Sequence, residues 1–105
     1  MTEFDPERFE DEKYDTYFTQ LQEAYRTAFD RMREQFDSTL VHGIDQQVLN
    51  ESEPVLVDGG FEIRLPEAPY DRLTGVAVER ERFETVLERY TEELRRALRE
   101  VFDRE

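Results

Sequence analysis

The chain has 105 residues, of which 27 are acidic and 14 basic, so its formal net charge at pH 7 is −13. This length is typical of one domain with a modest hydrophobic core. The absence of cysteine excludes disulfide scaffolds, thiolate metal sites and cysteine nucleophiles.

A long helix is predicted from about residue 6 to residue 49. Asp5 can cap its N-terminus, and Pro6 suits the first helical position. Apolar side chains then recur at alternating steps of four and three residues, the period of a helix with one buried face. They are Tyr14, Phe18, Leu21, Tyr25, Ala28 and Met32. This stripe requires a second element to cover it.

The apolar face of this helix changes direction after Phe36. Asp37 and Ser38 can cap a second helical segment, and Gly43 can loosen it. We therefore expect a kink or a break between residues 37 and 43.

A β-hairpin is predicted at about residues 55–65. An Asp-Gly-Gly turn at 58–60 separates two short apolar runs, and in the second run apolar residues alternate with Glu62 and Arg64. This alternation indicates a strand with one buried face and one face in water.

Residues 69–78 are predicted to form a helical turn, closed by Gly75, and then a short third strand at 76–78. A two-stranded ribbon is marginally stable alone. The hairpin therefore needs either this third strand or a helix against its apolar face.

The last predicted helix covers about residues 79–103, and its apolar residues again repeat every 3.5 positions. Two matched stripes favour antiparallel packing of this helix on the first one. The sequence therefore predicts a single α+β domain, in which a long, bent N-terminal helix, a hairpin and a C-terminal helix pack together.

The two predicted helices differ in length. Straight, they would measure about 66 Å and about 38 Å. The excess apolar length of the first helix predicts a homodimer, formed through a candidate interaction surface of Phe9, Tyr14, Tyr17 and Phe18. Alternatively, Phe102 and the last turn of the C-terminal helix cover these rings.

The charge is spread over both halves of the chain, and Lys13 is its only lysine. This pattern is typical of adaptation to concentrated salt, where self-repulsion is screened. The chain has no basic stripe for nucleic acid and no apolar run long enough for a membrane. Its acidic start is unlike a secretory signal, so we expect a cytoplasmic protein.

One group of polar residues is a candidate site, because the helix bend and the loop after the hairpin can meet. Its members are His42, Asp45, Gln46, Tyr70, Asp71 and Arg72. A histidine near a helix bend is more typical of hydrogen bonding than of catalysis, and no activated nucleophile accompanies it. We predict no catalytic residue, no metal ligand and no cofactor.

The runs VHGIDQQVLNESEP at residues 41–54 and PYDRLTGV at residues 69–76 resemble a family of small acidic haloarchaeal proteins of unknown function. The resemblance extends over nearly the whole chain. It implies a haloarchaeal cytosol, and it transfers neither an activity nor site residues.

The functional prediction is a non-enzymatic protein–protein interaction module that acts as a homodimer in a high-salt cytosol and contacts another cytosolic protein. One alternative is an enzyme or small-ligand binder with a pocket between the hairpin and the bend at His42. A further alternative is an acidic partner of basic proteins, such as those of the ribosome.

Overall fold

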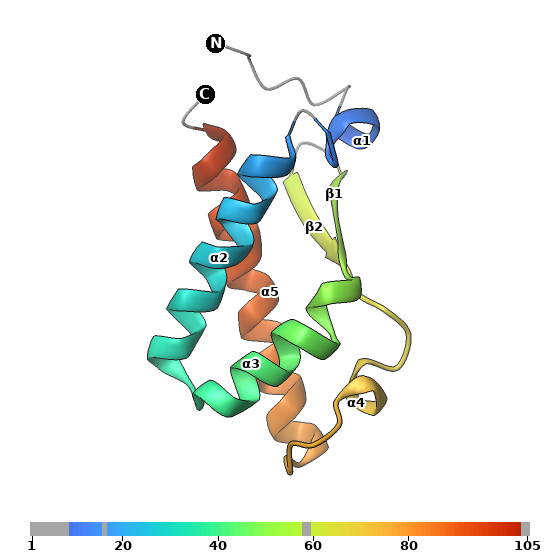
Figure 1. The fold of residues 1–105 in the computed structure, drawn as a ribbon, viewed down its shortest axis with the longest axis vertical. Coiled ribbons are helices and arrows are strands. Elements are labelled where there is room, and N and C mark those ends of the chain that lie inside the picture. The colour runs from blue at the N-terminus through green and yellow to red at the C-terminus, as the bar shows by residue number, and fades with distance from the viewer. Residues whose placement is uncertain (1–8, 16, 58–59, 104–105) are drawn as a thin grey trace.

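The computed structural model describes residues 9–15, 17–57 and 60–103. Its elements are α1 (Phe9–Glu12), α2 (Phe18–Gln35), α3 (Ser38–Gln47), the 3₁₀ turn η2 (Leu49–Glu51), β1 (Glu53–Val57), β2 (Gly60–Arg64), α4 (Pro69–Arg72) and α5 (Arg80–Asp103). Helices α2 and α5 lie side by side and run in opposite directions (Figure 1). The hairpin lies beside one end of this pair, and α3 crosses the other end. The predicted α+β class is confirmed.

The long N-terminal helix predicted for residues 6–49 has the expected break near residue 37, but the chain also turns between α1 and α2, which the prediction had not included. The first turn lies between α1 and α2, where the Tyr17 amide donates to the Glu12 carbonyl over 3.1 Å. The second lies at Phe36, which is extended, and at Asp37, whose carboxylate accepts from the Thr39 amide over 3.1 Å as the N-cap of α3. Asp5 and Pro6 lie outside the described residues.

The hairpin has two strands, paired antiparallel with Val55 opposite Glu62 and Leu56 opposite Phe61. The third strand predicted at 76–78 is wrong, since these residues have no strand conformation. Helix α5 packs on β2 and α1 packs on β1. These two helices therefore cover the hairpin, which a two-stranded ribbon requires for stability.

The segment after α4 packs on α3 instead of extending the sheet. A Cβ atom at Gly43 would lie 3.0 Å from Leu73 Cδ1 and 3.1 Å from Val76 Cγ2. The sequence had suggested that Gly43 loosens α3. Instead, α3 continues through Gly43, which lets this segment approach the helix closely. Gly75 has φ of +77°, a conformation that glycine adopts without a steric penalty.

The rings expected at a dimer interface are only partly exposed. Phe9 and Tyr17 are buried, and the ring centroid of Phe102 lies 5.8 Å from Phe9 and 5.7 Å from Tyr17. Phe61 of β2 completes this aromatic cluster, at 5.5 Å from Phe102. The expectation that Phe9 and Tyr17 are uncovered is therefore wrong, because the C-terminal turn of α5 and the hairpin cover them.

Lys13 is buried in the turn between α1 and α2. Its ammonium donates to Glu53 Oε1 over 2.6 Å and to the Pro54 carbonyl over 3.1 Å. It also lies 5.8 Å and 5.5 Å from the ring centroids of Phe9 and Tyr14. The only lysine of the chain thus ties the α1–α2 turn to β1.

A second buried charge, the Glu93 carboxylate of α5, lies at the contact with α2. Gln35 donates to its Oε2 over 3.2 Å. Three guanidinium groups lie within 4 Å of its oxygens, those of Arg31, Arg89 and Arg96. A buried carboxylate requires such compensation, and Arg31 and Gln35 supply part of it from α2.

Candidate functional site

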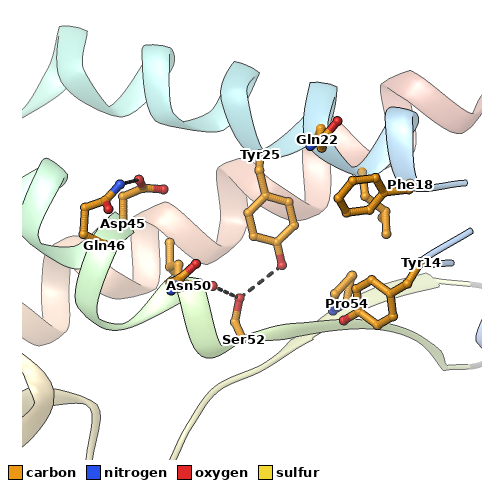
Figure 2. Close-up of a pocket in the computed structure, with 11 residues that line it drawn as sticks. Tyr14, Phe18, Gln22, Tyr25, Asp45, Gln46, Asn50, Ser52 and Pro54 are labelled. Atoms are coloured by element: carbon orange, nitrogen blue, oxygen red, sulfur yellow. Dashed lines mark hydrogen bonds between the residues drawn. The ribbon is translucent and has the colours of Figure 1, made fainter.

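A groove of about 270 Å³ lies between α2 on one side and α3, η2 and the start of β1 on the other (Figure 2). We call it the aromatic groove. Three rings line it, those of Tyr14, Phe18 and Tyr25, and polar side chains of α2, α3 and η2 complete its walls.

The helical period explains why these side chains meet. Phe18, Gln22 and Tyr25 follow one another at steps of four and three in α2, so they share one face of the helix. Asp45 and Leu49 are likewise four residues apart, and both line the groove. The break at Phe36 turns the α3 face toward the α2 face.

The two ends of the groove differ in character. Tyr14 and Phe18 lie at one end, with 59% and 45% of their surfaces exposed. Asp45 and Gln46 lie at the opposite end, and Tyr25 lies between the two ends. The groove therefore has an aromatic end and an acidic end.

Tyr25 and Ser52 join the two walls at the middle of the groove. Ser52 Oγ lies 2.6 Å from the Leu49 carbonyl oxygen, so the hydroxyl proton of Ser52 is donated there. The Tyr25 hydroxyl, 3.1 Å from Ser52 Oγ, must then be the donor to Ser52. Burial raises the pKa of Tyr25 to about 12, so this hydroxyl stays protonated at neutral pH.

Asp45 is held in place at the acidic end. Its Oδ2 accepts from the side-chain amide of Gln46 over 2.8 Å, and its Oδ1 accepts from the Tyr90 hydroxyl over 3.4 Å. Burial, and then the negative charge of Asp45, raise the pKa of Tyr90. Among the residues that the structure describes, Asp45 makes no ion pair with an arginine or lysine.

The side-chain amides of Gln22 and Asn50 also line the groove. Within the described part of the chain, neither amide has a hydrogen-bond partner. Each amide presents two donors and one carbonyl acceptor. These groups can bond to the backbone of a chain that enters the groove.

The predicted polar cluster does not form one site. Asp45 and Gln46 line the aromatic groove, whereas His42 lines a shallow depression with Phe29 and Arg33, its ring centroid 6.3 Å from that of Phe29. The pocket expected between the hairpin and the bend at His42 is therefore not the one observed.

The three cluster residues of α4 lie elsewhere. Tyr70 donates to the Val78 carbonyl over 2.6 Å, and its ring lies 5.3 Å from that of Phe83 in α5. Arg72 pairs with Glu51 and donates to the Glu67 carbonyl, while Asp71 is exposed. None of these three side chains is among the described residues that line the depression at His42.

A family model for proteins of unknown function, DUF5783, matches residues 1–105. The chain belongs to this family. A search of curated proteins and a search of solved structures found no match. The expected membership of a family of unknown function is confirmed, whereas a haloarchaeal source stays a prediction.

Across residues 9–15, 17–57 and 60–103, no helix has the length and apolar character needed to cross a bilayer. The same residues contain no group of three or more histidine, aspartate or glutamate side chains placed to hold a metal ion.

The sequence missed several groove residues. It placed Tyr25 in the buried stripe and gave no role to Gln22, Asn50 or Ser52. One signal was available: Gln22 interrupts the aromatic face of α2 at helical spacing. No sequence signal indicated that η2 lines the groove, because the position of η2 depends on the turn at Phe36.

Proposed function

We propose that this DUF5783 protein is a non-enzymatic interaction module that binds a segment of a partner protein in the aromatic groove. The observation that carries the proposal is the exposure of Tyr14 and Phe18 at one end of a groove. The groove also presents the side-chain amides of Gln22 and Asn50, which have no hydrogen-bond partner among the described residues. Exposed aromatic rings are typical anchors of protein interfaces.

The size of the groove supports a protein segment over a small molecule. Pockets for small ligands measure roughly 300–1,000 Å³ and enclose most of the ligand. The groove, at about 270 Å³, lies at the lower edge of this range. It suits one or two side chains of a longer chain, whose backbone can bond to the amides.

Replacing Phe18 by alanine tests the module. We expect Phe18→Ala to lower capture of the partner from a cell extract in concentrated KCl at least tenfold, the usual size of an aromatic hot spot. The measurement is quantitative mass spectrometry of proteins retained by the tagged variants. Val57→Ala is the matched control, since Val57 is 48% exposed and lies outside the groove.

Equal capture by both variants would contradict the groove as the binding surface. A homodimer is the second candidate, because the same two exposed rings can pack on a second copy. Light scattering separates the cases: a dimer mass for the wild type that falls to a monomer mass in Phe18→Ala assigns the rings to self-association.

We further propose that the protein works in a high-salt cytosol, an idea supported by its charge of −13 and single lysine. We expect its melting temperature to rise by roughly 10 °C between 0.1 M and 2 M KCl, because salt screens the repulsion among carboxylates. The measurement is circular dichroism against temperature.

A variant with three fewer negative charges is the control for this salt effect. Glu34→Gln, Asp71→Asn and Glu88→Gln alter exposed side chains that lie outside the groove. Its melting temperature should start higher in 0.1 M KCl and rise less with salt. A wild-type melting temperature that is independent of KCl would refute the proposed adaptation.

A further inference from the structure

The acidic end of the aromatic groove lacks a cation that its chemistry favours. Asp45 is partly buried beside the Tyr90 hydroxyl, and no arginine or lysine of the described residues lines the groove. A carboxylate in such a place gains more from an opposite charge than one in open water. Its remaining lone pairs can accept two parallel hydrogen bonds from a guanidinium group.

The rings of the groove are suited to the same group. Among the described residues, a guanidinium lies over an aromatic face elsewhere: Arg33 over Phe29 and Arg80 over Tyr70 at 5.2 Å, and Arg82 over Phe36 at 5.5 Å. In the described part of the chain, the Tyr25 ring has no such cation. It lies between the acidic end and the aromatic end of the groove.

Charge complementarity also favours a basic occupant. At short range, a segment with positive charge is attracted to the partly buried Asp45, and salt screens such a contact less than it screens attraction to the net charge of −13. Arginine fits better than lysine. Its guanidinium is planar, weakly hydrated and able to stack, so that its contacts depend less on the unscreened attraction that concentrated salt removes.

We propose that the partner segment inserts an arginine side chain into the acidic end of the groove, where its guanidinium pairs with Asp45 and stacks on Tyr25. This inference rests on the proposed function, in which the aromatic end receives an apolar side chain of the same segment. The occupant is thus a basic protein segment that carries arginine.

The test uses N-acetyl-arginine methylamide as the probe and ¹H–¹⁵N NMR of the full chain in 0.15 M and 2 M KCl. We expect saturable shifts of the Asp45, Gln46 and Asn50 signals. The citrulline analogue has nearly the same shape without the charge, and we expect it to bind at least fivefold more weakly. Equal shifts with citrulline would overturn the proposal without any variant.

Two variants locate the probe. Asp45→Asn keeps an acceptor for Tyr90 and removes the charge, and we expect it to weaken arginine binding about fivefold. Asp71→Asn removes an equal charge from an exposed site outside the groove, and it should leave binding unchanged. Equal weakening by both variants would show diffuse attraction only, and would also overturn the proposal. Melting curves confirm that both variants fold.

The outcomes separate this inference from the proposed function. If Phe18→Ala abolishes partner capture but Asp45→Asn and added arginine probe leave capture unchanged, the interaction module stands and the arginine site is wrong. If the probe binds at Asp45 but Phe18→Ala leaves capture unchanged, the arginine site stands and the aromatic end is not the anchor.

Discussion

Replacing Phe102 by alanine is expected to lower the free energy of unfolding by about 4 kcal/mol, the largest effect that we predict for a single side chain. Phe102 is buried and touches the rings of Phe9, Tyr17 and Phe61, which belong to three different segments. Its removal therefore leaves a cavity where α1, the hairpin and α5 meet. Urea unfolding followed by circular dichroism measures the loss.

Phe102→Leu is the matched control, since it keeps most of the apolar volume and removes only the edge-to-face and stacked ring contacts. We expect it to cost about 1–1.5 kcal/mol. The alanine variant should also uncover Phe9 and Tyr17 and so bind a hydrophobic dye. A loss below 1 kcal/mol in Phe102→Ala would show that the C-terminal turn does not cover these rings in solution.

Replacing Lys13 by methionine is expected to cost about 2 kcal/mol at pH 7. Methionine has a similar length and no charge, so the substitution removes two hydrogen bonds and leaves the buried Pro54 carbonyl without its donor. Part of that loss is offset because no ammonium group needs to be buried. Thermal and urea unfolding at fixed KCl concentration measure it.

Lys13→Arg preserves the charge and tests the size of the site. The ammonium lies between Glu53 and the rings of Phe9 and Tyr14, and a planar guanidinium is larger. We expect a cost of about 1–2 kcal/mol from overpacking. An arginine variant as stable as the wild type would refute the idea that only lysine fits here.

The pH dependence gives an independent check on the same pair. The hydrogen bond and charge of Lys13 lower the pKa of Glu53 below its ordinary value of 4.5. Between the pKa of Glu53 in the folded state and that in the unfolded state, the folded state therefore binds fewer protons. The stabilisation that the Lys13–Glu53 pair contributes is lost as the pH falls through the folded-state pKa. The stability difference between the wild type and Lys13→Met should narrow from pH 6 to pH 3, and a constant difference would contradict the pairing.

Local patterns predicted the elements that depend on near neighbours. The helical period identified α5, the alternation around Glu62 identified β2, and Asp37 marked the start of α3. The turn between α1 and α2 could not be read in this way, because the apolar spacing continues through it. The buried Lys13 at this turn contacts β1, a strand 40 residues further along the chain, and no local pattern shows such a contact.

The candidate site was predicted only in part. Asp45, Gln46, Tyr14 and Phe18 were singled out, but in two separate groups, and no local pattern indicated that the two groups meet. They line one groove because α3 folds back beside α2. The chain after the hairpin does meet α3, at Gly43, but His42 lines a different depression and Arg72 pairs with Glu51, so these two residues do not share a site.

By itself, the sequence determined the α+β class, the two main helical stripes, the hairpin and the acidic surface. Each of these features follows from a repeat of two or 3.6 residues or from composition, and none of them depends on contacts between residues far apart in the sequence. Only the tertiary structure decided which rings are buried and where the groove lies. The reason is that burial depends on which surface finds a partner, and Phe102 reaches Phe9 and Tyr17 only after α5 has packed against α2.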